Sequence, residues 1–432
     1  MLAPGLKLAW YGDDFTGASD TLATLAEAGL KARLFLDVPT PEQVQDAGGL
    51  DAIGIAGAAR AMAPEAMRAA LAPVARFFAG CGAPVLHYKC CSTFDSAPHV
   101  GSLGEAVRIF GAALGGGPAL IVGGQPSLGR YCAFGQLFAT AQAGGPVVRI
   151  DRHPTMSRHP VTPMDEADLR QHLQRQGLER IGLLDLRVHD QAGDALDAAF
   201  DALCGDAPQA VLMDVVGDAQ LGAIGRLLWQ RAQARPQLCV GASSVAQALI
   251  DHWGLPRCRH DGRIAPANGP VLVLAGSLSP LTARQVAAAR SFLHVPLDAA
   301  RLAAGDAAYA AHTAGELVRA LQAGRHVLAH TTPPASGSGV DGGDLAAQCG
   351  QLLRRVLVAA SVSRLGVAGG DTSSLALQAL APTALSWLGR PAPGVALCRA
   401  HAAEAWLDGT EVMLKGGQMG GDDLFEVLVA GR

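Results

Sequence analysis

Short apolar runs alternate with longer amphipathic stretches along most of the 432-residue chain. Around Met67, Leu71, Val74 and Phe78 the large apolar side chains recur at three- and four-residue steps, which is typical of a helix with one buried face. The short runs are apolar at nearly every position, as in strands that are buried on both faces. The alternation predicts an α/β fold in which helices flank a mainly parallel sheet. In the first part of the chain we expect strands at 7–11, 32–36, 51–56, 84–89, 120–123, 147–150, 181–186, 210–215 and 238–241.

The pattern also predicts where one domain ends and the next begins. Around 257–270 it gives way to charged residues, Gly and Pro, which indicates a linker. A second α/β series follows, so we expect two α/β domains, 1–262 and 263–432, with the active site in the cleft between them. The strands expected in the second domain are 271–277, 325–330, 364–370, 395–400 and 411–417.

Two local patterns add detail. In the stretch VTPMDEADLRQHLQ, Thr162 can cap a helix and Pro163 suits its first position, with acidic residues following. We therefore expect a helix that starts at Pro163. The stretch at 331–344 is rich in Gly, Ser and Pro and is typical of an exposed loop.

Composition narrows the class of protein. No apolar run approaches the ~18–20 residues that a membrane span needs, and the N-terminus is a poor signal peptide. The nine Cys are scattered without a CxxC pair, which favours reduced thiols in the cytoplasm. The net charge of −4 and the lack of a basic cluster argue against a nucleic-acid partner. We expect a cytoplasmic enzyme with no membrane or nucleic-acid partner, and the Ala-rich helix faces are compatible with a homodimer.

Candidate chemistry in the first domain lies where strands end. In open α/β sheets, ligands bind beyond the carboxyl ends of the strands. Cations, hydroxyls and carboxylates gathered at one edge suit a small, anionic, hydroxylated ligand, because Arg binds carboxylates and Asp accepts hydrogen bonds from hydroxyls. Each residue by itself could equally be a helix cap or a loop salt bridge. The strand-end loops supply Asp13, Asp14, Arg60, Lys89, Ser92, Thr93, Asp95, Arg130, Arg152 and His153.

The adjacent aspartates Asp13 and Asp14 pose a question of their own. Two neighbouring carboxylates repel each other unless both are solvated or paired. We expect them to face ligand hydroxyls or a cation rather than each other.

Glycine-rich loops follow three strands of the second domain: AGSLSP (275–280), AGGDTSS (368–374) and LKGGQMGGDDLF (414–425). Glycine lets a backbone come close to a ligand, and a helix N-terminus attracts phosphate. The chain has neither a Walker A loop nor a GxGxxG fingerprint there. Together the loops indicate a nucleotide site, although Asp371 taken alone could be a helix cap.

Phosphoryl transfer from a nucleotide to a hydroxyl requires Mg²⁺ and a base for the attacking hydroxyl. The candidates for the base are Asp371, Asp14 and Asp95, and the sequence assigns no metal ligands. A Mg²⁺-dependent phosphohydrolase that uses Asp13 and Asp14 is one alternative, but it needs a DxD spacing. A non-catalytic two-domain protein that binds a sugar acid and a nucleotide is another, and the missing signal peptide argues against it.

Four motifs resemble, in order and over nearly the whole chain, the four-carbon acid sugar kinase family: DDFTGA, YKCCSTFDS, AGGDTSS and LKGGQMGG. The resemblance implies an ATP- and Mg²⁺-dependent kinase that phosphorylates a terminal hydroxyl of threonate, erythronate or a 3-oxo-tetronate. Its first domain then binds the acid, through Asp13 or Asp14, Arg60 and the turn formed by Lys89, Cys90, Cys91 and Ser92. Its second domain binds ATP through Ser277, Gly369, Gly370, Asp371, Thr372, Gly416, Gly417, Gln418, Met419 and Gly420.

Two features of these motifs, at Met419 and at Cys90–Cys91, need separate interpretation. Met419 departs from the small or amide side chain followed by Phe that the family leads us to expect. Cys90 and Cys91 suggest a nucleophile, but the sequence shows no obvious His partner for them, and the alternative is two small residues whose backbone forms the turn.

Overall fold

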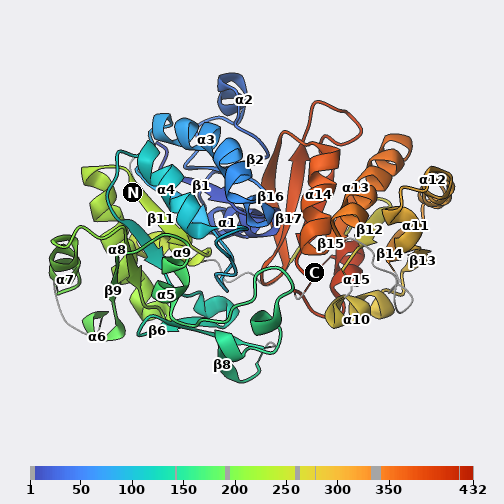
Figure 1. The fold of residues 1–432 in the computed structure, drawn as a ribbon. Helices are drawn as coiled ribbons and strands as arrows, with labels where there is room; N and C mark the ends of the chain where they lie inside the picture. Colours follow the sequence, from blue (N-terminus) through green and yellow to red (C-terminus); the bar gives the residue numbers. More distant parts are fainter. Residues whose placement is uncertain are drawn as a thin grey trace. The chain divides into compact units, whose positions relative to one another are not determined.

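The computed structural model describes residues 5–141, 144–189, 195–257, 263–277, 279–331, 342–417 and 419–431. The chain divides into two compact units (Figure 1). The N-terminal unit comprises Met1–Ala32 and Val38–Cys258, and the C-terminal unit comprises Arg33–Asp37 and Arg259–Arg432. The boundary expected between 262 and 263 borders residues outside the described part and stays a prediction.

The N-terminal unit is built on a sheet in which every pair of neighbouring strands is parallel, in the order β3-β1-β4-β11-β5-β10-β9. These strands are nearly all buried, as expected for strands covered on both faces. The strands are β1 (Leu8–Gly12), β3 (Ala52–Ala56), β4 (Val85–Lys89), β5 (Ala119–Val122), β9 (Ile181–Leu184), β10 (Ala210–Met213) and β11 (Gln237–Gly241).

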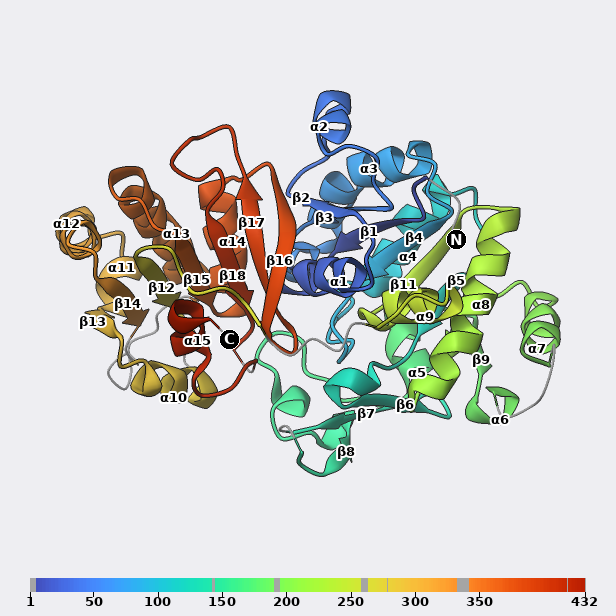
Figure 2. The same ribbon diagram turned by 180° about the vertical axis from the view of Figure 1, so that it is seen from behind.

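Two groups of helices flank this sheet. Helix α3 packs on α4, while α9 packs against both α1 and α8 (Figure 2). The helices of this unit are α1 (Phe15–Glu27), α2 (Pro41–Asp46), α3 (Pro64–Gly80), α4 (Leu103–Ala113), α5 (Leu169–Gln174), α6 (Leu186–His189), α7 (Ala195–Cys204), α8 (Asp218–Ala234) and α9 (Ser244–His252).

A small antiparallel sheet is inserted between β5 and α5. It consists of β6 (Arg130–Ala133), β7 (Gln136–Thr140) and β8 (Val147–Arg149). The expected strand at 147–150 therefore forms, but outside the main sheet.

The helix that we expected to start at Pro163 does not start there. Helix α5 begins only at Leu169, with Asp168 as its N-cap. The Leu137 amide of β7 donates to the carbonyl of Ala167, and Gln136 bridges Asp168, so the preceding segment is drawn out beside β7. The pairing with β7 outweighs the local helix-start signals around Pro163.

The C-terminal unit has a mixed sheet. Its parallel part runs β13-β14-β12-β15-β18, and β17, β16 and β2 extend it in antiparallel fashion. Residues 34 and 35 of β2 pair with β16, so a segment from early in the chain belongs to this unit. The strands are β2 (Ala32–Phe35), β12 (Val271–Ala275), β13 (Phe292–Leu297), β14 (His326–Thr331), β15 (Arg364–Ala368), β16 (Ala384–Ala392), β17 (Val395–His401) and β18 (Glu411–Lys415).

Helices cover this sheet in two groups as well. Helix α13 contacts α11, α12 and α14, whereas α10 packs on α15. They are α10 (Pro280–Ala288), α11 (Ala299–Ala303), α12 (Ala307–Gln322), α13 (Gly342–Ala359), α14 (Gly370–Leu380) and α15 (Leu424–Ala430). Most of the loop expected at 331–344 lies outside the described residues. The fold class is confirmed: two α/β units, each with a mainly parallel sheet flanked by helices.

None of the helices in the described ranges combines the length and the apolar character that crossing a membrane requires.

Candidate functional site

Parallel neighbours β3, β1 and β4 bring three of the predicted residues together in the N-terminal unit. The Asp13 amide, just after β1, donates to the carbonyl of Lys89 at the end of β4 (3.0 Å). The Arg60 amide, after β3, donates to the carbonyl of Asp13 (3.1 Å). Because parallel strands end at the same edge, loops that are far apart in the sequence form one cluster there.

The Arg60 guanidinium binds both aspartates. Its Nη2 and Nε donate to Asp13 Oδ1 (2.7 Å) and Oδ2 (3.3 Å), and its Nη1 donates to Asp14 Oδ2 (2.8 Å). Asp14 also caps α1, since its Oδ1 accepts from the Gly17 amide (2.7 Å). The adjacent carboxylates therefore face a common cation, as the sequence led us to expect. We expected the Arg60 guanidinium to bind a ligand carboxylate. Three of its donors are instead occupied by the two aspartates.

The two neighbouring carboxylates differ in pKa. Burial raises the pKa of Asp13 to about 6, against the opposing attraction of Arg60. Burial acts on Asp14 in the same direction, but the charges of Arg60 and Lys89 and the hydrogen bonds from Thr16 and Gly17 outweigh it, so the pKa of Asp14 is lowered. Asp14 is thus a firmly ionised hydrogen-bond acceptor, whereas Asp13 can exchange a proton near neutral pH.

The turn after β4 adds further polar groups. The Lys89 ammonium is buried and donates to the carbonyl of Cys90 (2.7 Å). Thr93 contacts both the Cys91 thiol (2.9 Å) and the Asp95 carboxylate, and Ser92 is also buried. The charge of Asp95 acts on Arg60, which places this turn beside the aspartate cluster.

The Cys90 and Cys91 thiols are poor nucleophiles. Burial raises the pKa of Cys91 to about 11 and that of Cys90 well above its ordinary value. Because the thiolate is the reactive form, these side chains are inert near neutral pH.

The two remaining arginines of the prediction are placed differently. Arg130 Nη1 donates to the carbonyl of Leu128, and Arg130 lies within electrostatic reach of Cys91. Arg152 is exposed, and its charge acts on its neighbour Asp151. The structure thus brings Arg130 toward the cluster, whereas among the described residues no hydrogen bond or ion pair joins Arg152 to it.

In the C-terminal unit the three glycine-rich loops meet at the carboxyl ends of β12, β15 and β18. The Ser277 amide donates to the carbonyl of Ala368 (3.1 Å), and the Gly369 amide donates to the carbonyl of Lys415 (2.9 Å). A Cβ on Gly417 would lie 2.7 Å from Ser277 Oγ, so this backbone approaches Ser277 as closely as only glycine allows.

Gly369 caps α14 with φ of +128°, a backbone conformation that favours glycine. Helix α14 starts at Gly370, so Asp371 lies inside the first turn and is not the N-cap. The amides of this first turn, including that of Thr372, are left without intrahelical acceptors and form an anion-binding end. The side chain of Asp371 and the whole of Gln418 lie outside the described residues.

Sequence reasoning missed the residues that hold the last glycine loop. Ser279 Oγ donates to the carbonyl of Gly417 (2.5 Å), and Gln285 Nε2 donates to that of Met419 (3.0 Å) and to that of Gly421 (2.9 Å). Ser279, within the AGSLSP motif, is the N-cap of α10, and Gln285 lies further along the same helix. The sequence analysis identified the AGSLSP loop, but no local signal indicates that the Ser279 hydroxyl reaches a loop about 140 residues away.

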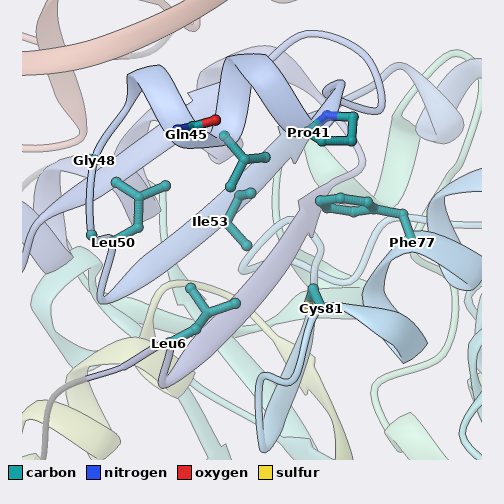
Figure 3. Close-up of a pocket in the computed structure, with 10 residues that line it drawn as sticks. Leu6, Pro41, Gln45, Gly48, Leu50, Ile53, Phe77 and Cys81 are labelled. Atoms are coloured by element: carbon teal, nitrogen blue, oxygen red, sulfur yellow. The ribbon is translucent and has the colours of Figure 1, made fainter.

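One pocket of the N-terminal unit lies away from the aspartate cluster (Figure 3). It has a volume of about 600 Å³ and is lined mainly by apolar side chains near α2, among them Leu6, Leu50, Ile53 and Phe77. Leu6 precedes β1, whereas Asp13 follows it, so this hollow is at the opposite end of the sheet from the aspartate cluster.

Comparison with known proteins identifies the class. A family model described as a sugar-binding N-terminal domain matches residues 8–249, and one described as a nucleotide-binding C-terminal domain matches residues 272–425. The chain thus combines a sugar-binding and a nucleotide-binding domain, as sugar kinases do.

Characterised relatives extend over nearly the whole length. The chain is 38% identical to a 3-oxo-isoapionate kinase of Paraburkholderia graminis, over 99% of this chain and 95% of the relative. It is 33% identical to a 3-oxo-tetronate kinase of Methylobacterium radiotolerans, over 97% and 98%. The chain belongs to the four-carbon acid sugar kinase family. It is a phosphotransferase that uses ATP and acts on a hydroxyl group of a sugar acid.

Solved structures confirm the fold. A crystal structure from Salmonella typhimurium LT2 has a TM-score of 0.76 at 24% identity, with 98% of each chain covered. A second, HI1011 of Haemophilus influenzae, has a TM-score of 0.72 at 24% identity, covering 97% of this chain and 98% of the other.

Proposed function

We propose that this kinase phosphorylates the terminal hydroxyl of a short 3-oxo sugar acid, with 3-oxo-isoapionate and 3-oxo-tetronate as the first candidates. The Asp13–Asp14–Arg60–Lys89 cluster is the observation that carries the proposal. It combines hydrogen-bond acceptors for hydroxyls with a buried ammonium for a carboxylate. The names of the two relatives above support the choice of acids.

Within the cluster we assign separate roles. Lys89 binds the acid carboxylate, because its ammonium donates one hydrogen bond to the Cys90 carbonyl and has further donors for a ligand. Asp13 and Asp14 accept hydrogen bonds from substrate hydroxyls while Arg60 holds both carboxylates in place. Ser92, Asp95 and Arg130 complete the pocket, with the backbone of Cys90 and Cys91 shaping the turn. Arg152 remains a predicted contact without a described link to the cluster.

The proton acceptor is the next assignment. A general base works best when its pKa lies near the working pH. The pKa of about 6 makes Asp13 better suited than the firmly ionised Asp14. Asp371 remains the candidate from the nucleotide side.

The ATP site is proposed at the glycine loops. Ser277, Gly369, Gly370, Thr372, Gly416, Gly417, Met419 and Gly420 fit a polyphosphate, because the close approach at Gly417 and the free amides of α14 present backbone N–H groups. Gln418 and the Asp371 carboxylate are kept as predicted contacts. When bound, ATP supplies the transferred phosphoryl group.

Mg²⁺ is proposed to arrive with ATP. The described side chains contain no group of three or more His, Cys, Asp or Glu placed to hold a metal. Mg²⁺ is commonly bound by substrate phosphates with one or two carboxylates and water, so it needs no cage of protein ligands.

The reaction is proposed to take place in the cytoplasm, where ATP is plentiful. A homodimer is proposed on the basis of the Ala-rich helix faces, and light scattering would test it.

The test is an ADP-release assay with Mg²⁺-ATP and a panel of acids: 3-oxo-isoapionate, 3-oxo-tetronates, and D- and L-forms of threonate and erythronate. We expect turnover on a 3-oxo acid. Turnover on threonate or erythronate alone would overturn the substrate assignment, and ADP release without any acid would indicate ATP hydrolysis.

A further inference from the structure

Lys415 stands out as a buried charge at the nucleotide end of the C-terminal unit. It is the last residue of β18, immediately before the Gly416–Gly420 loop, and its side chain is fully buried. Its carbonyl accepts from the Gly369 amide, which ties it to the start of α14 (2.9 Å). Burying an ammonium costs several kcal/mol unless other groups compensate for the lost water.

The compensation around Lys415 is incomplete. Its Nζ donates to Thr282 Oγ1 (3.0 Å), and in the part of the chain that the structure describes no carboxylate lies within ion-pair distance of it. An ammonium has three donors, so two are left over. Thr282 lies in the first turn of α10, where the helix dipole is positive and disfavours a cation. Burial lowers the pKa of Lys415 to about 8.

A second buried cation in the same sheet shows what a purely structural role requires. Arg364, at the start of β15, is also almost fully buried. Its Nε donates to Glu411 Oε2 (2.7 Å), and its Nη atoms donate to the carbonyls of Leu428 (2.6 Å) and Ala265 (3.1 Å). Arg364 is thus neutralised and satisfied within the protein, whereas Lys415 is not.

The surroundings of Lys415 are rich in donors and poor in anions. Thr282 Oγ1, which accepts from Lys415, itself donates to the carbonyl of Gly417 (3.3 Å), so the ammonium is linked to the glycine loop through one hydroxyl. The starts of α10 and α14 both point positive helix ends toward these loops. A polyanion is the ligand that this arrangement lacks.

We propose that Lys415 is a positioning residue for the phosphates of ATP, holding the Gly416–Gly420 loop through Thr282 and supplying the buried positive charge that the phosphates neutralise. The inference rests on the proposed ATP site and adds a residue to it. It implies that the protein tolerates an unpaired buried cation because the phosphates of the bound nucleotide neutralise its charge.

The variant Lys415→Met tests this, because methionine has a similar length and no charge. Calorimetric titration with ATP, ADP and adenosine should show at least a tenfold loss of affinity for ATP, a smaller loss for ADP, and adenosine binding within twofold of the wild type. Arg364→Met serves as the matched control. It should lower the melting temperature and, in the protein that remains folded, keep the ratio of ATP to adenosine affinity.

The wild-type protein gives an independent test that needs no variant. Of the described groups that bond to Lys415 or pair with it, namely Thr282 on α10 and Ala368 on β15, neither carries a charge. At pH 9 about one tenth of Lys415 is protonated, so the dissociation constant of ATP should rise about tenfold from pH 7 to pH 9. Adenosine affinity should stay constant over the same range.

The outcomes separate the two claims. If the wild type binds no ATP, the proposed nucleotide site is wrong. If it binds ATP but Lys415→Met lowers ATP and adenosine affinity equally, or leaves both unchanged, then the role of Lys415 is structural and the inference is overturned. A flat pH dependence for ATP would overturn it as well.

Discussion

Replacing Asp13 with Asn should stabilise the protein at neutral pH and at the same time disable it. Asp13 holds its proton more tightly in the folded chain than in the unfolded chain. Its pKa is about 6 when folded, against an ordinary value of 3.8. Ionising it as the pH rises from about 4 to 6 therefore costs folding free energy. At 1.36 kcal/mol per pKa unit the cost reaches about 3 kcal/mol above pH 6.

Asparagine removes this cost, but it keeps only part of the pairing with Arg60. Asp13 accepts two hydrogen bonds from that guanidinium, and an amide can accept only at its oxygen, so roughly 1 kcal/mol is lost again. The expected net gain for Asp13→Asn is about 2 kcal/mol at pH 7.5. It should shrink to near zero at pH 4.5, where the wild-type carboxyl is largely protonated when folded.

Asp14→Asn is the matched control, and its expected effect has the opposite sign. The pKa of Asp14 is lowered, so its charge stabilises the fold above its ordinary pKa, and this stabilisation is lost as the pH falls. Asparagine remains a good helix cap, so the comparison isolates the charge. We expect a loss of about 1–3 kcal/mol at pH 7.5 for this charge-assisted pairing, and a smaller loss at pH 4.5.

Urea denaturation at the two pH values measures both changes in the transition that unfolds the N-terminal unit. ADP release with the preferred acid measures activity, and we expect Asp13→Asn to lose more than 100-fold in kcat. If Asp13→Asn destabilises the protein equally at both pH values, the pairing with Arg60 outweighs burial and the reasoning is refuted.

Three further predictions follow from the two sites. Lys89→Met should weaken binding of the acid more than tenfold and change ATP affinity less than twofold, as measured by calorimetry; equal losses for both ligands would contradict the division between the units. Gly417→Ala should raise the KM for ATP about tenfold, because its Cβ would lie 2.7 Å from Ser277 Oγ, whereas Gly416→Ala, with its nearest neighbour at 3.7 Å, should change it little. Cys91→Ser should retain activity and iodoacetamide should inactivate the wild type only slowly at pH 7.5, because the thiol pKa is about 11; rapid inactivation that the Ser variant abolishes would show a reactive thiol.

The parts of the fold that follow from local pattern could be predicted from the sequence. Buried strands, the helices between them and the polar loops at strand ends are all encoded in short stretches. The loops after β1, β3 and β4 could be assigned to one edge because parallel strands end together.

The inserted antiparallel sheet shows what local pattern does not contain. The hairpin between β6 and β7 turns at Phe134 and Gly135, which both have positive φ, yet Phe is not a residue that signals such a turn. The turn is held by Asp214, whose carboxylate accepts from the Phe134 amide (2.5 Å) and the Gly135 amide (2.9 Å) from about 80 residues away. A contact over that distance has no signal in the local sequence.

Strand β16 is not among the strands expected from the sequence. Gly389 and Pro391 lie within it, and the strand tolerates them because its pairing with β17 is irregular at Gly389 and beyond. In the site, the sequence named Asp13, Asp14 and Arg60 but not their pairing. Their unequal pKa values depend on burial and on the geometry of Arg60, which only the structure provides.

The central claim is that the protein transfers the γ-phosphoryl group of ATP to a terminal hydroxyl of a sugar acid. The most direct test is a proton-coupled ³¹P NMR spectrum of the protein incubated with Mg²⁺-ATP and the acid that gives turnover in the ADP-release assay. Phosphorylation of a terminal CH₂OH predicts that the γ-phosphorus signal of ATP is replaced by a phosphate-monoester triplet, with ADP formed in equal amount. A signal of inorganic phosphate in place of the triplet would contradict the account, because it would mean that the protein hydrolyses ATP without transferring its phosphate to the acid.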